Sequence, residues 1–396
     1  MKTLPFEGLR VVEFTHMVMG PTCGMVLADL GAEVIKVEPP TGDNTRRLLG
    51  SGAGFYPLFN RNKKSLVLDL QSPEGQEAVL RLIATADVVS ENFKPGTMKK
   101  LGLDHESLKK LNPRLIHVSH KGFLPGPYDH RTALDEVVQM MGGLAYMTGR
   151  PGDPLRAGSS VNDIMGGLFG AIGVMAALSA REKTGEGCEV QSALFENNVF
   201  LVAQHMMQFA VTGQPAAPMP DRISSWGIYD VFQVADGEQI FLAVVSDTQW
   251  AIFCEAFGYQ DLKADARLMG NNNRVRARDW LIPLLRERLA LQKAADLAAI
   301  FERHGLPFAP ITKPHELLDD PHLLATGGLA PITLPDGQRA GETAQTVLLP
   351  LALDGERLGV RCSPPRLGEH SDELLTSLGY TAEQAAKLSR TVLKAD

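Results

Sequence analysis

The carboxylate best placed for covalent chemistry in this sequence is Asp163, which follows Asn162 and precedes a glycine-dotted apolar stretch ending near Arg181. Aspartate is among the residues most favoured as a helix cap. If Asn162 caps the helix instead, Asp163 lies in the first turn, where the helix dipole favours the ionised form. An ionised carboxylate can attack an activated acyl group. The local sequence leaves both roles open, cap and nucleophile, and the rest of the chain favours the nucleophile.

A second group of candidate residues follows the predicted strand at 87–90. It contains Asn92, Phe93 and Lys94, with Lys99 and Lys100 shortly after. Asparagine can hydrogen-bond to a purine or ribose, and lysine can bind phosphate as a point charge. The same residues would also suit a solvated surface loop, so the segment alone does not decide.

Composition and missing motifs exclude several classes of protein. A net charge of −7 argues against nucleic-acid binding. The four cysteines have no CxxC spacing, so they lack the usual pattern of a zinc or redox site. Scattered cysteines of this kind are typical of small buried side chains in a reducing compartment. Neither GxGxxG nor a P-loop motif occurs, nor HExxH or GxSxG, so redox, nucleotide-hydrolysing, zinc and serine-hydrolase chemistry lack their usual residues. We expect a cytoplasmic protein without a metal, a resident cofactor or a membrane partner.

The elements that would position these residues alternate along the first half of the chain. Strand-like runs at 9–15, 33–38, 65–70, 87–90 and 115–119 alternate with helix-like runs at 22–30, from 72 onward and at 105–111. Such alternation predicts an α/β fold with a parallel sheet, which binds ligands at the carboxyl ends of its strands. The loops at 16–21, 39–44, 91–96 and 121–135 are therefore the candidate site.

The composition also divides the chain into parts. We predict a large Rossmann-like domain over 1–205, a Gly- and Pro-containing linker over 206–224, a smaller α+β domain over 225–325, and a return to the large domain over 326–396.

Taken in order, several short motifs resemble those of the class III CoA-transferases, the CaiB/BaiF family, which includes formyl-CoA and carnitine-CoA transferases and methylacyl-CoA racemases. The motifs are LRVVEFT (9–15), GP (20–21), LGAEVIKVE (30–38), NKKSLVLDL (62–70), ENFKPG (91–96), LNPRL (111–115), KTGEG (183–187), HGLPFAP (304–310) and LGEHSDE (367–373). Each is weak alone, but in this order they span nearly the whole chain.

The resemblance implies a specific fold and chemistry. Two chains would interlock as a homodimer, and Asp163 stands where the family has its catalytic aspartate. The family binds CoA near Asn92, Phe93 and Lys94, and Leu68 and Lys100 also match its CoA contacts. The implied reaction moves CoA from an acyl-CoA to a carboxylic acid through an aspartyl-CoA thioester, and N–H groups near Trp226 could stabilise the oxyanions. Arg131 could pair with a CoA phosphate, a substrate carboxylate or Asp135.

Departures from the family pattern narrow the substrate. Val18 replaces a substrate-side glutamine of formyl-CoA transferase, Pro39 replaces a CoA-contacting arginine, and no glycine-rich loop occurs near 224–227. Leu134 stands where formyl-CoA transferase has a tyrosine and the racemases have a basic histidine, so racemisation lacks its base. We expect a short dicarboxylate such as succinate or a C4–C5 relative as substrate. Intramolecular transfer between two carboxyls of one substrate, and a non-catalytic acyl-CoA-binding protein, remain as alternatives.

Overall fold

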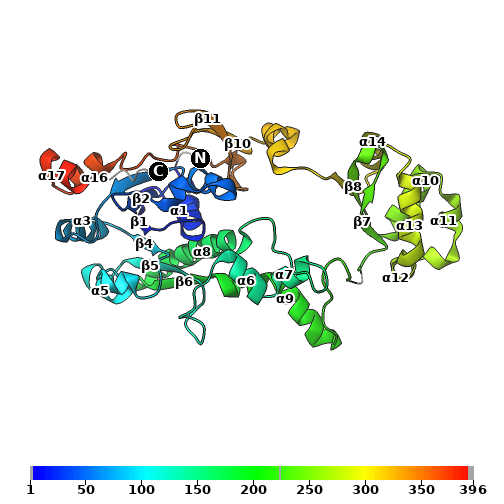
Figure 1. Ribbon diagram of the computed structural model, residues 1–396, viewed down its shortest axis with the longest axis horizontal. Coiled ribbons are helices and arrows are strands. Elements are labelled where there is room, and N and C mark those ends of the chain that lie inside the picture. The colour runs from blue at the N-terminus through cyan, green and yellow to red at the C-terminus, as the bar shows by residue number, and fades with distance from the viewer. Residues whose placement is uncertain (1–2, 223, 391–396) are drawn as a thin grey trace. The chain divides into compact units, whose positions relative to one another are not determined.

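The computed structural model describes residues 3–222 and 224–390 and divides into two compact units (Figure 1). The described residues up to Pro218, together with those from Pro321 onward, form the larger unit. Residues Met219–Asp320 form the smaller one. The larger unit contains most of the candidate residues.

A six-stranded parallel sheet organises the larger unit, in the order β3-β2-β1-β4-β5-β6. The strands are β1 (Arg10–Phe14), β2 (Glu33–Glu38), β3 (Lys63–Val67), β4 (Val88–Glu91), β5 (Ile116–Lys121) and β6 (Glu189–Ala193). The chain order changes direction between the adjacent strands β1 and β4, which makes their carboxyl ends the switch point where such sheets bind ligands. The parallel α/β architecture predicted from the sequence is confirmed.

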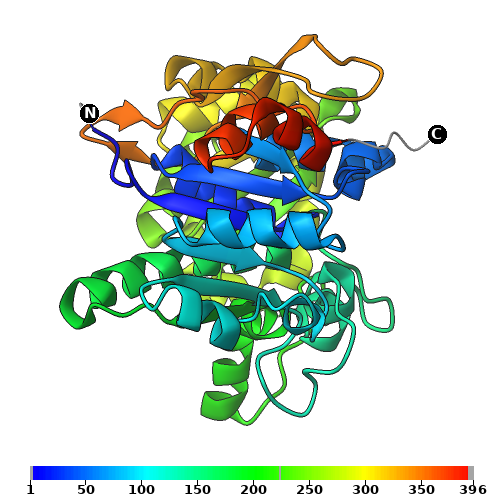
Figure 2. The same ribbon diagram turned by 90° about the vertical axis from the view of Figure 1, so that its left-hand side faces the viewer.

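Helices cover both faces of this sheet, because successive side chains of a strand point to opposite faces. Val11 packs in a core with α1 (Met19–Asp29) and α8 (Val161–Thr184). Its neighbour Val12 packs in a second core with α3 (Pro73–Ile83), α5 (His105–Leu111), α16 (Ser371–Ser377) and α17 (Ala382–Leu388). Figure 2 shows this second layer in front of the strands.

Helices α1 and α8 pack unusually closely because glycines line their contact. A Cβ on Gly167 would lie 2.5 Å from the carbonyl oxygen of Met19 and 2.5 Å from Cβ of Thr22, and one on Gly170 would lie 2.5 Å from Cε1 of His120. At 24 residues α8 is long and apolar enough to cross a membrane. Its packing against α1 and the sheet instead makes it a core helix of the larger unit.

The C-terminal part of the chain returns to the larger unit along edge strand β3. The backbone N–H of His370 donates to the carbonyl of Ser65 at 3.1 Å, and Val67 N–H donates to Oγ of Ser371 at 3.1 Å. Before β3, Asn62 adopts the left-handed conformation at φ 62° and accepts the N–H groups of Arg361 and Cys362 at 2.6 and 2.9 Å. These contacts cover an edge that would otherwise present unpaired backbone groups.

The smaller unit consists of an antiparallel sheet and surrounding helices. Its strands β7 (Ile228–Gln233), β8 (Gln239–Val244) and β9 (Phe308–Pro310) pair in that order. Its main helices are α10 (Asp247–Ala256), α11 (Gln260–Ala264), α12 (Asn271–Arg276), α13 (Arg278–Leu289) and α14 (Ala294–Arg303). Their apolar side chains form one separate core.

The connection to the smaller unit begins later than the sequence suggested. Helix α9 (Leu194–Thr212) continues through the predicted start of the linker at 206 and ends at Gly213, which has a left-handed φ of 69°. The reason is local, because no glycine or proline precedes Gly213 in this helix. After Thr333 the chain adds the hairpin strand β11 (Thr343–Val347), paired with β10 (Leu329–Thr333).

Candidate active site

Asp163 lies in the first turn of α8 and does not cap it. Ser160 occupies the capping position, and its side chain makes no capping hydrogen bond. Of the placements that the sequence left open, the structure has Asp163 in the first turn; neither Asn162 nor Asp163 caps the helix, because both are already helical. The Asp163 side chain is partly buried and, among the described residues, makes no hydrogen bond or ion pair. Leaving a carboxylate without a partner in a half-buried position costs stability, so such an arrangement points to a role other than structural.

The missing cap comes from Asp135, the first residue of α6 (Asp135–Met141). Oδ1 of Asp135 accepts the backbone N–H of Asn162 at 2.8 Å and that of Asp163 at 3.3 Å. The other carboxylate oxygen, Oδ2, accepts from Nε2 of Gln139 one turn further along α6. Asp135 therefore does not pair with Arg131, an alternative that the sequence had left open.

The surroundings of Asp163 favour its protonated form. Burial, followed by the negative charges of Asp135 and Glu136, raises the pKa of the Asp163 carboxyl from 3.8 to about 7. Glu136 is itself paired with Arg156. A carboxylate of high pKa is more basic than an ordinary aspartate, and hence more reactive toward an acyl carbon once it is ionised.

The close packing of α8 on α1 brings the helix of Asp163 to the loop after β1. A Cβ on Gly166, one turn beyond Asn162, would lie 2.3 Å from Cε of Met19 and 2.8 Å from Nδ2 of Asn197. The glycines after Asp163 thus admit neighbouring protein atoms. The first turns of α8 therefore lie against the end of the loop at 16–19.

The same loop is tied to the carboxyl ends of β2 and β4. Asn92 accepts the N–H of His16 at 3.0 Å and donates to its carbonyl at 2.7 Å. Met17, strained at φ 63°, donates its N–H to Oγ1 of Thr45 at 2.9 Å. A non-glycine residue in this conformation persists only where its surroundings hold it, and such residues cluster at functional sites. The loop at 16–19 thus joins the candidate CoA loop to the helix of Asp163.

The loop after β4 is held by buried charges. Glu91 accepts the N–H of Phe93 at 2.9 Å through one oxygen and binds Nζ of Lys121 at 2.6 Å through the other. Lys121 also donates to the carbonyl of Phe93 at 3.2 Å. The Phe93 ring lies 6.1 Å from the ring of His16. This leaves Phe93 fixed and partly exposed, while Lys94 projects into solvent.

The remaining candidate residues differ in what they offer. Leu68 follows β3 directly and is fully buried in the same core that Phe93 contacts, so only its backbone can face a ligand. Lys100 ends α4 (Thr97–Lys100), and neither it nor Lys94 has an ion-pair partner among the described residues. Arg131 is exposed and stacks on the ring of Tyr128 at 4.1 Å.

The loop near Trp226 belongs to the smaller unit, and its N–H groups are already occupied. Trp226 N–H donates to Oγ of Ser224 at 3.2 Å, and Gly227 N–H donates to Oδ1 of Asn271 at 3.1 Å. In this conformation neither N–H is available to an oxyanion.

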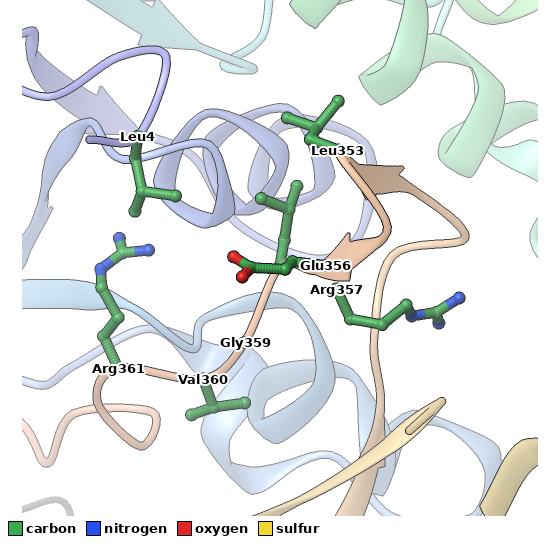
Figure 3. Close-up of a pocket in the computed structure, with 8 residues that line it drawn as sticks. Leu4, Leu353, Glu356, Arg357, Gly359, Val360 and Arg361 are labelled. Atoms are coloured by element: carbon green, nitrogen blue, oxygen red, sulfur yellow. The ribbon is translucent and has the colours of Figure 1, made fainter. Parts of the chain in front are cut away.

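One cavity of about 290 Å³ lies elsewhere in the larger unit (Figure 3). Leu4 and Arg361 lie on one side of it and Leu353 and Arg357 on the other. Arg361 is engaged there, because it donates to the carbonyl oxygens of Ala28 and Asp29 at the end of α1. None of the candidate residues lines this cavity. Within residues 3–222 and 224–390, no cluster of His, Cys, Asp or Glu could hold a metal ion.

Two residues of the site have roles that the sequence did not reveal. Gln139 accepts the N–H of Ala157 at 2.7 Å, and Asp135 caps α8. The sequence contains one indication of this pair: Asp135 and Gln139 are four residues apart, which places both side chains on one face of α6.

Known proteins match the chain over almost its whole length. The family model for CoA-transferase family III matches residues 6–371. A succinate–glutarate CoA-transferase of Agrobacterium fabrum is 34% identical over 96% of this chain and 97% of its own. An acetyl-CoA:oxalate CoA-transferase of Acetobacter aceti is 36% identical over 81% of this chain and 84% of its own. A CAIB/BAIF family protein of Brucella suis superposes with a TM-score of 0.84 at 34% identity, over 95% of this chain and all of that one. The chain therefore belongs to CoA-transferase family III, the CaiB/BaiF family, and is a CoA-transferase.

Proposed function

We propose that this enzyme transfers CoA from an acyl-CoA to a short dicarboxylate, with Asp163 as the covalent nucleophile. One observation carries the proposal. Asp163 is a partly buried carboxylate with a raised pKa, and it has no hydrogen-bond or ion-pair partner among the described residues. A structural aspartate in such a place would normally be paired. A nucleophile must instead keep its oxygen lone pairs free for the acyl carbon.

The first half of the reaction loads CoA onto the enzyme. An ionised oxygen of Asp163 attacks the thioester carbonyl of the donor, the C–S bond breaks, and a mixed anhydride and CoA thiolate result. The thiolate then attacks the Asp163 carbonyl carbon. The anhydride C–O bond breaks, leaving an aspartyl-CoA thioester and the donor as its carboxylate. No net proton is gained or lost.

The second half repeats these steps with the acceptor. Its carboxylate attacks the Asp163 thioester carbonyl, expelling CoA thiolate and forming a second mixed anhydride. Attack of the thiolate on the acceptor's carbonyl yields the new acyl-CoA and regenerates the Asp163 carboxylate. Burial of Asp163 serves this chemistry, because water would hydrolyse either anhydride.

The carboxyl edge of the sheet supplies groups that suit CoA. Lys94 and Lys100 are exposed cations for its phosphates, and Phe93 offers a fixed aromatic surface. Leu68 would contribute backbone atoms only, because its side chain is buried. Asn92 already uses its amide on His16, so we assign its contribution mainly to shaping the loop. Arg131, stacked on Tyr128, remains available for a phosphate or a substrate carboxylate.

A C4–C5 dicarboxylate such as succinate is the proposed substrate class. The relative from Agrobacterium fabrum is named for succinate and glutarate, whereas the relative from Acetobacter aceti is named for oxalate. Val18 and Leu134 replace polar residues of formyl-CoA transferase, which disfavours oxalate and formyl-CoA as substrates. Transfer within one dicarboxylyl-CoA uses the same chemistry and is the second candidate. Leu134 offers no proton-transferring group, which disfavours a racemase.

We also propose a homodimer of interlocked chains in the cytoplasm. Helix α9 exposes many large apolar side chains that a monomer would leave in water, namely Phe200, Leu201, Met206, Met207, Phe209 and Val211. Phe169 and Ile172 of α8 are also exposed, and Phe169 contacts Phe200 at 5.8 Å between ring centroids. A continuous exposed apolar surface of this kind is typical of a subunit interface. The cysteines, all of them free, suit a reducing compartment.

The proposal is tested by trapping the intermediate. The enzyme is incubated with succinyl-CoA and then hydroxylamine, and its peptides are analysed by mass spectrometry. A hydroxamate on Asp163 is the expected result. Asp163→Ala should give none, and the exposed control Asp153→Asn should label like wild type. A racemase or a mere acyl-CoA-binding protein would leave Asp163 unlabelled with every donor of an acyl-CoA panel while still binding CoA.

A further inference from the structure

We propose that Asp135 is a positioning residue for the nucleophile, holding the first turn of α8 by its hydrogen bonds and tuning Asp163 by its charge. The inference rests on the proposed function, because it takes Asp163 as the reacting group. Asp135 is not expected to touch the substrate itself. Asp135 acts on Asp163 through a hydrogen bond to the Asp163 backbone and through its own negative charge.

The geometry of the cap is the first argument. Helix α8 begins without a side-chain cap of its own, although free N–H groups at a helix start normally find one. Asp135 is buried and accepts two of these N–H groups, those of Asn162 and Asp163. One of the two belongs to the nucleophile's own backbone. Any displacement of Asp135 would therefore be transmitted directly to Asp163.

The cap is itself fixed by a second side chain. Gln139 donates to Asp135 through Nε2 and accepts the N–H of Ala157 at 2.7 Å through Oε1. The segment from Ala157 to Asp163 is thus held to α6 at both ends. This is more restraint than the start of a helix usually has, since a single capping side chain is the ordinary arrangement.

The charges around Asp163 give the second argument. The charged groups that act on it from α6 are Asp135 and Glu136, and Glu136 is paired with Arg156. The groups of other elements that face the first turns of α8 are uncharged, namely Met19 and Thr22 of α1, Ser192 of β6 and Asn197 of α9. Further along α8, His120 of β5 lies against Gly170, and burial lowers the pKa of His120 to about 3; Asp87 is paired with Arg181 of α8. The negative charge next to Asp163 that has no ion-pair partner among the described residues is therefore that of Asp135, and it adds to the effect of burial in raising the pKa of Asp163.

Two variants separate the cap from the charge. Asp135→Asn keeps an oxygen able to accept both N–H groups but removes the charge, and Asp135→Ala removes both. Glu136→Gln is the matched control, because it removes the adjacent charge without touching α8. Thermal unfolding confirms that each variant is folded before it is used.

The first measurement does not depend on turnover. Titration of Asp163 by NMR, with aspartate labelled at the side-chain carboxyl carbon and Asp163→Asn for assignment, should show its pKa falling in Asp135→Asn. The fall should be clearly larger than in Glu136→Gln. An unchanged titration in Asp135→Asn would overturn the inference whatever the activity. A titration that moves as expected in an enzyme that forms no adduct would instead count against the proposed function alone.

The second measurement is the rate of the first half-reaction. Asp135→Ala should slow formation of the Asp163 adduct by roughly 100-fold, because small misplacements of a reacting group cost about that much. The dissociation constant for CoA should change by less than about threefold, and Asp135→Asn should recover at least tenfold of the lost rate. Adduct formation within twofold of wild type in a folded Asp135→Ala would show that the residue is only a helix cap.

Discussion

The side-chain amide of Asn92 and the backbone of His16 form a closed pair of hydrogen bonds, of 3.0 and 2.7 Å, between the carboxyl ends of the adjacent strands β4 and β1. This pair lies at the switch point of the sheet, where ligands of such folds bind. It links the loop that carries Phe93 and Lys94 to the loop that contacts α8. The loop proposed to bind CoA and the loop beside the helix of Asp163 are thus connected through one asparagine.

Asn92→Ala should therefore impair catalysis beyond its cost in stability. Loss of the two hydrogen bonds should lower the free energy of unfolding by about 1–3 kcal/mol. We expect the KM for acyl-CoA to rise about tenfold, because the loop at 16–19 loses its fixed geometry. Asn112→Ala is the matched control. Asn112 precedes β5 and donates to the carbonyl of Ala86 at 2.9 Å, so this hydrogen bond lies at the amino ends of the strands, away from the candidate site. Urea unfolding and steady-state kinetics compare the two variants. A similar loss of stability with unchanged KM in Asn112→Ala would support a role of Asn92 in shaping the site. Equal kinetics in both variants would contradict that role.

The raised pKa of Asp163 predicts how activity depends on pH. The nucleophile must be ionised, so kcat/KM should fall tenfold per pH unit below about pH 7, where the carboxyl becomes protonated. An ordinary aspartate would remain ionised down to about pH 4. A profile of kcat/KM between pH 5 and 9 with a stable acyl-CoA donor measures this limb. A flat profile down to pH 5 would show that the Asp163 carboxyl has an ordinary pKa.

The same shift has an opposite consequence for stability. Because the pKa of Asp163 is higher in the folded than in the unfolded protein, the folded protein binds this proton more tightly. The stabilisation that the proton provides is complete below pH 4 and is lost as the pH rises through 7. Asp163→Asn, which stays neutral, should thus be more stable than wild type at pH 8, with a melting temperature higher by on the order of a few degrees. The difference should vanish near pH 4. Thermal unfolding at the two pH values tests the sign, and a variant less stable than wild type at pH 8 would refute it.

Local patterns in the sequence were sufficient for the first five strands of the parallel sheet, but no predicted run covered β6. The apolar runs that end at Gly31 and at Pro39 mark the first helix and the second strand, because a glycine or proline at the end of such a run favours a turn there. The cap of α8 could not be predicted in this way. Asp135 is 27 residues from Asn162, and only the packing of α6 on α8 brings the two together.

The functions of polar residues were also beyond local patterns. An asparagine after a strand can bind a ligand or hold a loop, and the choice for Asn92 depends on where His16 lies in space. The linker predicted over 206–224 starts too early for a related reason, because α9 continues until Gly213 ends it.

The glycines of α8 should be intolerant of substitution where α1 approaches. In Gly167→Ala the new methyl group would meet the backbone oxygen of Met19, which cannot rotate away. The helices must separate, so we expect a loss of about 1–3 kcal/mol in the free energy of unfolding and a large loss of activity. Gly54→Ala is the control, because its new Cβ meets no atom within 4 Å and its φ is an ordinary −82°. Urea unfolding of both variants should separate them clearly; equal stabilities would mean that α8 can shift without cost.

A buried ion pair lies next to the loop at 16–21. Removing one of its two charges should destabilise the protein more than removing both. Nζ of Lys63 lies 2.8 Å from Oε1 of Glu13, both side chains are fully buried, and Lys63 also donates to the carbonyl of Pro21 at 3.0 Å. Lys63→Met would leave the Glu13 carboxylate buried without a cation, which costs about 3–5 kcal/mol. Adding Glu13→Gln removes the stranded charge, so the double variant should recover at least half of that loss. Urea unfolding of the two single variants and the double variant forms a complete cycle. Additive losses would show that Glu13 and Lys63 do not stabilise one another. Lys63 would then support the loop carrying His16 and Met17 only through its hydrogen bond to the carbonyl of Pro21.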